Sequence, residues 1–346
     1  MAKTPGAASP VDLFAVQPYM TLQDYRDPDA FADHLERLGA PVAHRAHEAA
    51  LVVFPEDIAT FLALAAAPAG LDQVATLDDA FRLLGRRLLR QLLWTRLRHR
   101  AGSMEAAFFT AAAPAVYRAW HRTFSRLARL WGATVVAGSA LLPANALGYG
   151  SDAYQARDAR VLNLSLTFGP DGQVHDHTAK VNLVPTQEDR LHLAPDAAPR
   201  SVYAVGPHLV GTAICYDAFH VPHTPHEQRF TGQVPALAAL GATIIAQPSA
   251  NPWWWDQPWP LDPSSSGPRL RRDQWMSEGL PAAMAAAPTI RAGVNPQLLA
   301  RLWDVHFDGR SMIFGRQDGT VKVMAHAPRS DAHPDSEALI HWSLTV

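Results

Sequence analysis

The only cysteine of this chain, Cys215, ends an apolar run, "LVGTAIC", and is followed at once by Tyr216 and Asp217. A thiol at the end of a strand, where substrate could reach it, could attack a carbonyl or nitrile carbon. Such chemistry needs a base for the thiol proton and a donor for the oxyanion that forms. The alternative is a small buried side chain with a purely structural role.

Two further segments place charged side chains near strand ends. Glu56 follows the apolar run "LVVFP", and Lys180 lies in "HTAKVNLVPTQE" ahead of Pro185 and Glu188. A carboxylate is costly to bury without a partner, although each charge could also be a solvated surface group. Open α/β sheets bring the carboxyl ends of different strands together in one crevice. We therefore expect Glu56, Lys180 and Cys215 to share one site.

Strands and helices alternate along the chain, and these elements must position the three side chains. The pattern predicts helices at 27–40, capped by Asp27, at 114–133, ending at Gly132, and at 226–242. Strands are expected at 12–20, 49–56, 134–142, 207–215, 243–250 and 338–346, with hairpins around 169–172 and 317–320. This arrangement is typical of an α/β protein with mixed sheets, and no segment has the composition of a domain linker.

Composition excludes several classes of protein. With 346 residues, 48% of them hydrophobic, the chain can bury a large core. A net charge of −2 gives no indication of a nucleic-acid or acidic-membrane partner. A single cysteine cannot form a disulfide within the chain, and we find neither a signal-peptide pattern nor a long apolar run. We expect a cytoplasmic protein that does not contact membranes.

The segment 81–100 is unusual because it holds seven arginines among many leucines. We expect a structural helix packed on more than one side, with the arginine side chains reaching water, because the apolar positions form no clean stripe. A basic helix that binds a membrane or nucleic acid is the alternative.

Histidines occur in two clusters that could suggest a metal site. His220, His223 and His226 lie in "HVPHTPH", and His175 and His177 lie in "HDH". The prolines of the first cluster disfavour a helix, so its side chains would not share one helical face. We therefore expect a surface loop there and no metal site in either cluster.

Three segments resemble motifs of the nitrilase superfamily, the carbon–nitrogen hydrolases that use a Glu–Lys–Cys triad. "LVVFPE" ends at Glu56, "KVNLVPTQE" begins at Lys180 and ends at Glu188, and "GTAICYD" contains Cys215, in the family's order. Weaker similarity, in "FAVQP", "LGATIIAQPSAN" and "FDGRSMIFGRQDGTV", extends the resemblance from about residue 12 to about residue 325.

The resemblance implies a four-layer α-β-β-α sandwich that forms one domain over residues 1–346. It also implies a homodimer or a larger homo-oligomer. Two segments depart from the family, an apparent helical insertion at about 68–110 and an elaborated loop at about 251–275. These departures concern the choice of substrate rather than the triad.

The resemblance further implies a role for each residue of the site. Cys215 would attack the substrate, Glu56 would act as the base, and Lys180 with the backbone N–H of Tyr216 would stabilise the tetrahedral intermediate. Glu188 would hold Lys180 in place. The thioester would then be hydrolysed after ammonia or an amine has left, and neither a metal nor an organic cofactor is needed.

An amide is the expected substrate, with a nitrile or an N-carbamoyl compound as alternatives. A catalytically silent protein used for binding or scaffolding is the alternative from another class. The loop after residue 250 holds Asn251, Trp253 and Trp254, which we expect to border the acyl pocket. Four tryptophans between 253 and 259 favour a bulky acyl group if they form the pocket wall, whereas core or interface packing is their other interpretation.

Overall fold

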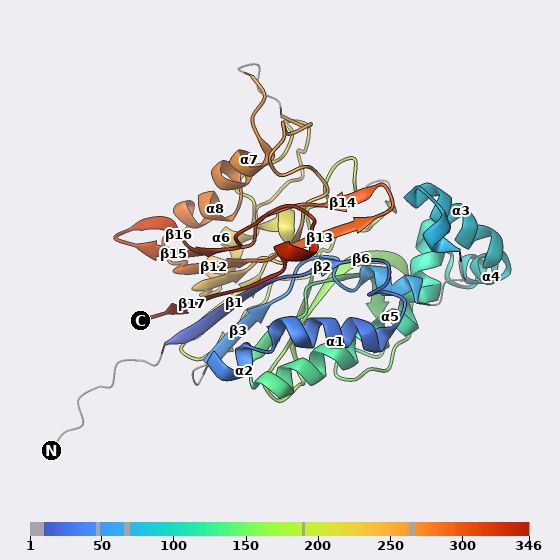
Figure 1. Cartoon of the computed structure of the whole chain (residues 1–346), viewed down its shortest axis with the longest axis horizontal. Coiled ribbons are helices and arrows are strands. Elements are labelled where there is room, and N and C mark those ends of the chain that lie inside the picture. Colours follow the sequence, from blue (N-terminus) through green and yellow to red (C-terminus); the bar gives the residue numbers. More distant parts are fainter. Residues whose placement is uncertain (1–9, 46–48, 66–69, 189–190, 263–266, 346) are drawn as a thin grey trace.

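The computed structural model describes the chain except for residues 1–9, 46–48, 66–69, 189–190, 263–266 and 346. Two large mixed sheets pack face to face between helices (Figure 1). The first has the order β17 (Ala338–Leu344), β1 (Val11–Gln17), β3 (Ala49–Val53), β4 (Thr134–Val136), β6 (Ala156–Phe168) and β5 (Ala140–Asn145), with β7 (Val174–Ala179) also paired to β6.

The second large sheet has the order β16 (Thr320–His326), β15 (Met312–Gln317), β12 (Ala292–Asn295), β10 (Ile244–Ala246), β9 (His208–Thr212) and β8 (Tyr203–Val205). A small sheet beside them joins β11 (Ser249–Ala250), β13 (Gln297–Leu302), β14 (Val305–Phe307) and β2 (Tyr19–Met20). The strand pairs β3–β4 and β9–β10 are parallel. The segments that leave their carboxyl ends therefore lie at common sheet edges.

Helices cover the outer faces of both large sheets. The first sheet is covered by α1 (Pro28–Gly39), α2 (Val42–Arg45) and the long α5 (Met104–Trp131), and the second by α6 (Val234–Ala239) and α8 (Leu280–Ala286), which α7 (Arg271–Glu278) precedes. Between the sheets, Leu13 and Leu51 pack with Val210, Ile244 and other aliphatic residues, all buried. The predicted four-layer α-β-β-α sandwich is confirmed.

Most predicted elements are present with shifted ends. The helix at 27–40 is α1, and the Asp27 side chain accepts a hydrogen bond at its N-terminus. The predicted helix at 114–133 begins ten residues earlier, at Met104, contains Pro114, and ends where Gly132 takes a left-handed conformation. Both predicted hairpins form, as β6–β7 and β15–β16.

The prediction of a long helix at 226–242 is wrong, since only Val234–Ala239 is helical. The backbone N–H of Thr231 donates to Asn182, and that of Gln233 donates to the carbonyl of Asp217. Because tertiary partners take these donors, the segment before Val234 cannot form helical hydrogen bonds.

The arginine-rich segment also differs from expectation. It forms two helices, α3 (Leu77–Arg87) and α4 (Leu89–His99), which project beside the sandwich (Figure 1). The expected packing on more than one side is wrong: Leu92 is buried, but Trp94 is 59% exposed and Leu97 is 82% exposed. The reason is that α4 packs against α5 along one face and has no second neighbour of comparable contact among the described residues.

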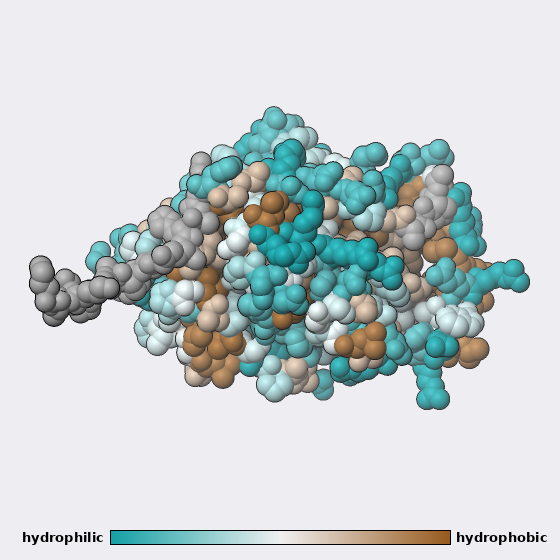
Figure 2. All heavy atoms as spheres, turned by 90° about the horizontal axis from the view of Figure 1, so that it is seen from below, coloured by the Kyte–Doolittle hydropathy of each residue, from teal (hydrophilic) through white to brown (hydrophobic). Residues whose placement is uncertain are grey.

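The remaining surface is mixed in character. Hydrophobic residues occur in several separate areas on the face shown in Figure 2, among mostly hydrophilic ones. No helix of the described part of the chain combines the length and the apolar composition that a membrane span requires.

Candidate active site

Cys215 lies three residues after β9, at the start of the 3-10 helix η4 (Cys215–Ala218). Its φ is +46°, a left-handed conformation that is rare for a residue with a side chain. Its N–H donates to the carbonyl of Pro248 (2.8 Å), and its buried Sγ lies 3.8 Å from the carbonyl oxygen of Ala250. Sparsely populated backbone conformations of this kind cluster at functional sites, where the surroundings hold them in place.

Glu56 lies three residues after β3, and a tight turn fixes it. Gly138, with a φ of +59°, lies against this turn, and a Cβ there would be 2.0 Å from the carbonyl oxygen of Pro55. The N–H of Asp57 donates to Ser139 Oγ (2.8 Å). Glu56 Oε2 then accepts the N–H of Ala250 (3.0 Å), the residue whose carbonyl faces the Cys215 thiol.

Lys180 lies directly after β7 and bridges two carboxylates. Its Nζ is 2.8 Å from Glu56 Oε1 and 2.8 Å from Glu188 Oε2, and all three side chains are buried. The carboxylate of Asp217, two residues after the cysteine, accepts the N–H groups of Val181 (3.0 Å) and Asn182 (2.7 Å). This contact ties the loop that follows the lysine to the loop that carries the thiol.

The structure thus brings Glu56, Lys180, Cys215 and Glu188 into one cluster. Sequence reasoning missed another member, Asn163 of β6, whose Nδ2 donates to Glu56 Oε1 (2.8 Å) and to Glu188 Oε1 (3.1 Å). The available signal was an amide in the middle of the apolar strand "VLNLSL", where a buried polar side chain requires partners.

Burial and mutual charge set the protonation behaviour of the cluster. Burial raises the pKa of the Cys215 thiol well above its ordinary value, and the Glu56 charge raises it further. Burial also raises the pKa of Glu56, with Lys180 opposing and Glu188 adding to the effect. Burial alone would lower the pKa of Lys180, but the Glu188 and Glu56 carboxylates raise it well above its ordinary value. A neutral thiol therefore lies beside a carboxylate of increased basicity and a permanent cation.

Tyr216 contributes its backbone and its ring in different ways. Its N–H donates to no described residue outside its own short 3-10 helix, so it is available as a donor. Its ring stacks on His223 (centroids 3.9 Å apart), and its hydroxyl donates to Glu227 Oε2 (2.8 Å). The expectation of a surface loop is therefore wrong for His223, which is buried, while His220 and His226 are exposed.

The three residues expected to border the acyl pocket have different surroundings. Asn251 is buried next to Ala250, and its Nδ2 donates to the carbonyls of Trp253 (2.6 Å) and Asp308 (2.8 Å). Trp253 is half-buried, whereas Trp254 is 43% exposed and stacks on His306 (3.9 Å). Asn251 and Trp253 thus follow closely after Ala250, the residue whose carbonyl faces the Cys215 thiol.

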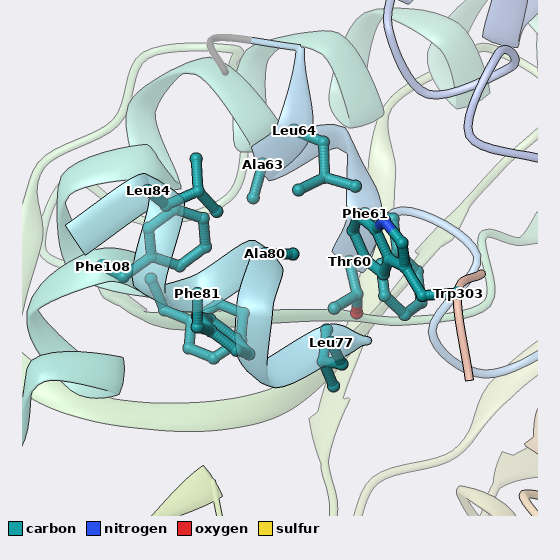
Figure 3. Close-up of a pocket in the computed structure, with 11 residues that line it drawn as sticks. Thr60, Phe61, Ala63, Leu64, Leu77, Ala80, Phe81, Leu84, Phe108 and Trp303 are labelled. Carbon is teal, nitrogen blue, oxygen red and sulfur yellow. The ribbon is translucent and has the colours of Figure 1, made fainter. Parts of the chain in front are cut away.

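An apolar pocket of about 40 Å³ lies farther along the segment that follows Glu56 (Figure 3). Its walls come from the 3-10 helix η1 (Thr60–Leu64), from α3 and α5, and from Trp303, which faces it from beyond β13. Its one polar wall residue, Thr60, donates through Oγ1 to Asp57 Oδ1 (2.7 Å). The pocket therefore offers space but no reactive group.

Metal ligands do not gather in the described part of the chain, where no group of three or more histidine, cysteine, aspartate or glutamate side chains could hold an ion. The chemistry available to the cluster is that of a thiol, two carboxylates and an ammonium group.

The fold is that of amidases of the nitrilase superfamily. A crystal structure of an amidase from Nesterenkonia sp. matches with a TM-score of 0.54 and 16% identity, over 99% of this chain and 92% of the other. A form of the Nesterenkonia sp. AN1 amidase in complex with butyramide matches equally well, with 16% identity over 99% and 93% of the two chains. No protein-family model and no curated protein matches the sequence. At this identity the likeness shows a shared fold.

Proposed function

We propose that this protein hydrolyses the carbon–nitrogen bond of a non-peptide amide through a thioester on Cys215. The observation that carries the proposal is the buried cluster in which Lys180 bridges Glu56 and Glu188 at 2.8 Å beside the thiol. The Nesterenkonia sp. AN1 amidase, which shares the fold, supports it, since variants of that enzyme form complexes with butyramide and with acrylamide.

The proposed reaction begins with transfer of the thiol proton to Glu56 while Sγ bonds to the amide carbon. Lys180 and the N–H of Tyr216 stabilise the oxyanion of the tetrahedral intermediate. Glu56 then gives its proton to the leaving nitrogen as the C–N bond breaks, and ammonia or an amine departs. A water molecule, deprotonated by Glu56, attacks the thioester, and the proton returns to the sulfur as the acid leaves.

The test is ammonia release from a panel of amides, nitriles and ureides, with the Cys215→Ala variant as control. The proposal is supported if the wild type releases ammonia from amides and the Cys215→Ala variant does not. Turnover of nitriles or ureides only would assign the alternative substrate classes. A wild type that releases no more ammonia than the variant from any compound would favour a binding or scaffold role instead.

We also propose that the protein forms a dimer or a larger homo-oligomer. Among the described residues, the C-terminal strand β17 pairs only with β1. Its other edge is therefore open to a second copy of the chain. Light scattering should return a multiple of 37.7 kDa. The monomer mass at every concentration would contradict this proposal.

A further inference from the structure

Arg271, the first residue of α7, is a buried cation with no described carboxylate in ion-pair contact; Glu278 acts on it at longer range and is itself paired with Arg269 (2.6 Å). Its side chain is 2% exposed, and its Nε donates to Asn251 Oδ1 (2.8 Å) while Nη1 donates to Gln274 Oε1 (2.6 Å). Both acceptors are neutral amides, and no described carboxylate forms an ion pair with the guanidinium. Burial lowers the pKa of Arg271 to about 9, which reflects the cost of this charge.

Three tryptophan rings surround the guanidinium. Its Cζ lies 4.6 Å from the ring centroid of Trp253, 5.3 Å from that of Trp259 and 5.4 Å from that of Trp275. The rings stabilise the cation through their faces but supply no acceptor. On the contrary, the buried indole N–H groups of Trp259 and Trp275 are themselves without a hydrogen-bond partner among the residues that the structure describes.

Counting donors and acceptors shows what is missing. A guanidinium has five N–H groups, and Arg271 uses two of them on described residues. The two indole N–H groups are buried donors without a partner among the described residues, so together with Arg271 they give the cluster a surplus of donors and a positive charge. Buried donors of this kind are normally paired, so the missing partner is a group that accepts several hydrogen bonds and carries negative charge.

The cluster adjoins the nucleophile. Asn251, which accepts from Arg271, directly follows Ala250, the residue that donates to Glu56 and faces the Cys215 thiol. The negative charge of a Cys215 thiolate would raise the pKa of Arg271, as the charge of Glu278 does. An acyl group bound for attack by the thiol would thus extend along a wall that contains this cation.

We propose that Arg271 binds a carboxylate on the acyl part of the substrate, so that the preferred substrate is the half-amide of a short dicarboxylic acid. This inference rests on the proposed amide hydrolysis. The planar fork of an arginine matches a carboxylate in bidentate geometry, and such charge-assisted pairs are the strong ones at a desolvated site. The bound carboxylate supplies the acceptor and the counter-charge that the cluster lacks.

The test compares anionic and neutral amides of matched shape. Malonamate, succinamate and glutaramate each receive a neutral partner in which an isopropyl group replaces the carboxylate. For wild type, kcat/KM should be higher for at least one anionic amide than for its neutral partner. In Arg271→Met this preference should fall about 10- to 100-fold, the range expected when a hydrogen bond to a charged group is lost. Arg271→Lys, which keeps the charge without the fork, should fall between the two.

Arg272→Met is the matched control, because Arg272 is the next residue, has a side chain that is 49% exposed, and pairs with Asp256 on the surface. It should keep the wild-type preference. The carboxylate site is refuted, while amide hydrolysis stands, if wild type has equal kcat/KM values for the neutral and the anionic amides. The same holds if Arg271→Met lowers kcat/KM equally for both series.

A second measurement does not depend on turnover or on folding of the arginine variants. Succinate or glutarate should raise the melting temperature of Cys215→Ala, whereas the neutral amides at the same concentration should raise it less. If no amide of either series releases ammonia, the proposed reaction fails, and the melting shifts still test the anion site. Equal shifts with the charged and neutral compounds would overturn it.

Discussion

Replacing Lys180 by methionine should separate the structural from the chemical role of the lysine. In the structure, Lys180 Nζ lies 2.8 Å from a carboxylate oxygen of both Glu56 and Glu188. Lys180→Met leaves two buried carboxylates next to each other without their cation. Removing one partner of a buried pair typically costs about 3–5 kcal/mol, so we expect the free energy of unfolding to fall by about 3 kcal/mol at pH 7.

The loss should depend on pH in a defined direction. Without the lysine, burial and mutual repulsion raise the pKa of the two carboxyl groups in the folded state. A raised carboxyl pKa means that the folded state binds protons more tightly than the unfolded state. The variant should therefore be least impaired near pH 5, and its deficit should grow as pH rises towards 7.

A second substitution provides the control. Lys180→Met combined with Glu188→Gln leaves one carboxylate instead of two, so it should regain more than half of the lost stability. Turnover should not recover, because both variants lack the cation proposed to stabilise the oxyanion and should remain about 10²- to 10³-fold slower than wild type. Urea unfolding and ammonia release measure the two quantities. A single variant as stable as wild type, or a double variant as active as wild type, would refute this account of Lys180.

Three further predictions follow from single groups. Cys215→Ala should abolish turnover but change the free energy of unfolding by only about 1 kcal/mol, because one buried atom is lost; wild-type turnover would exclude the thiol as nucleophile. Because burial raises the pKa of Glu56, kcat/KM should fall with decreasing pH already above the ordinary glutamate range, and a flat profile down to pH 4.5 would contradict a base at this position. Burial lowers the pKa of His34, but its hydrogen bonds to Asp24 and Glu337 outweigh this and raise it to about 9. The stability that His34 adds over His34→Gln should therefore be complete below pH 6.5 and decline by up to about 3 kcal/mol as pH rises to 9, as urea unfolding at several pH values can show; a constant difference would contradict it.

The sequence predicts much of the buried cluster because three of its residues lie just beyond strands. Glu56 follows β3, Lys180 follows β7 and Cys215 follows β9, and the chain's topology brings these ends together. Asn163 escapes this reasoning because it lies inside a strand, where a polar residue normally marks the outward face. Only the paired sheet reveals that its amide reaches both glutamates.

Local patterns fail where distant residues take over backbone or side-chain partners. The segment before Val234 has helical composition, yet its N–H groups bond to Asn182 and to the carbonyl of Asp217. The prediction for α4 is wrong for the opposite reason. A leucine-rich pattern predicts burial on several sides, but no second element covers the exposed face of this helix among the described residues. In both cases the deciding contacts are tertiary, so a window of ten or twenty residues does not contain them.

The two buried charge clusters differ in how their charges are balanced. Lys180 is paired with carboxylates from other parts of the chain, so this cation needs no ligand as a counter-charge. Arg271 lies twenty residues beyond Asn251 in the sequence, and the described groups in direct contact with its guanidinium are neutral amides and indoles. A buried cation without an ion-pair partner destabilises the folded state, and a bound anion would offset that loss of stability. The chemistry common to many hydrolases thus lies in motifs that can be recognised from the sequence, whereas the proposed choice of substrate depends on a long loop whose residues meet only in the folded protein.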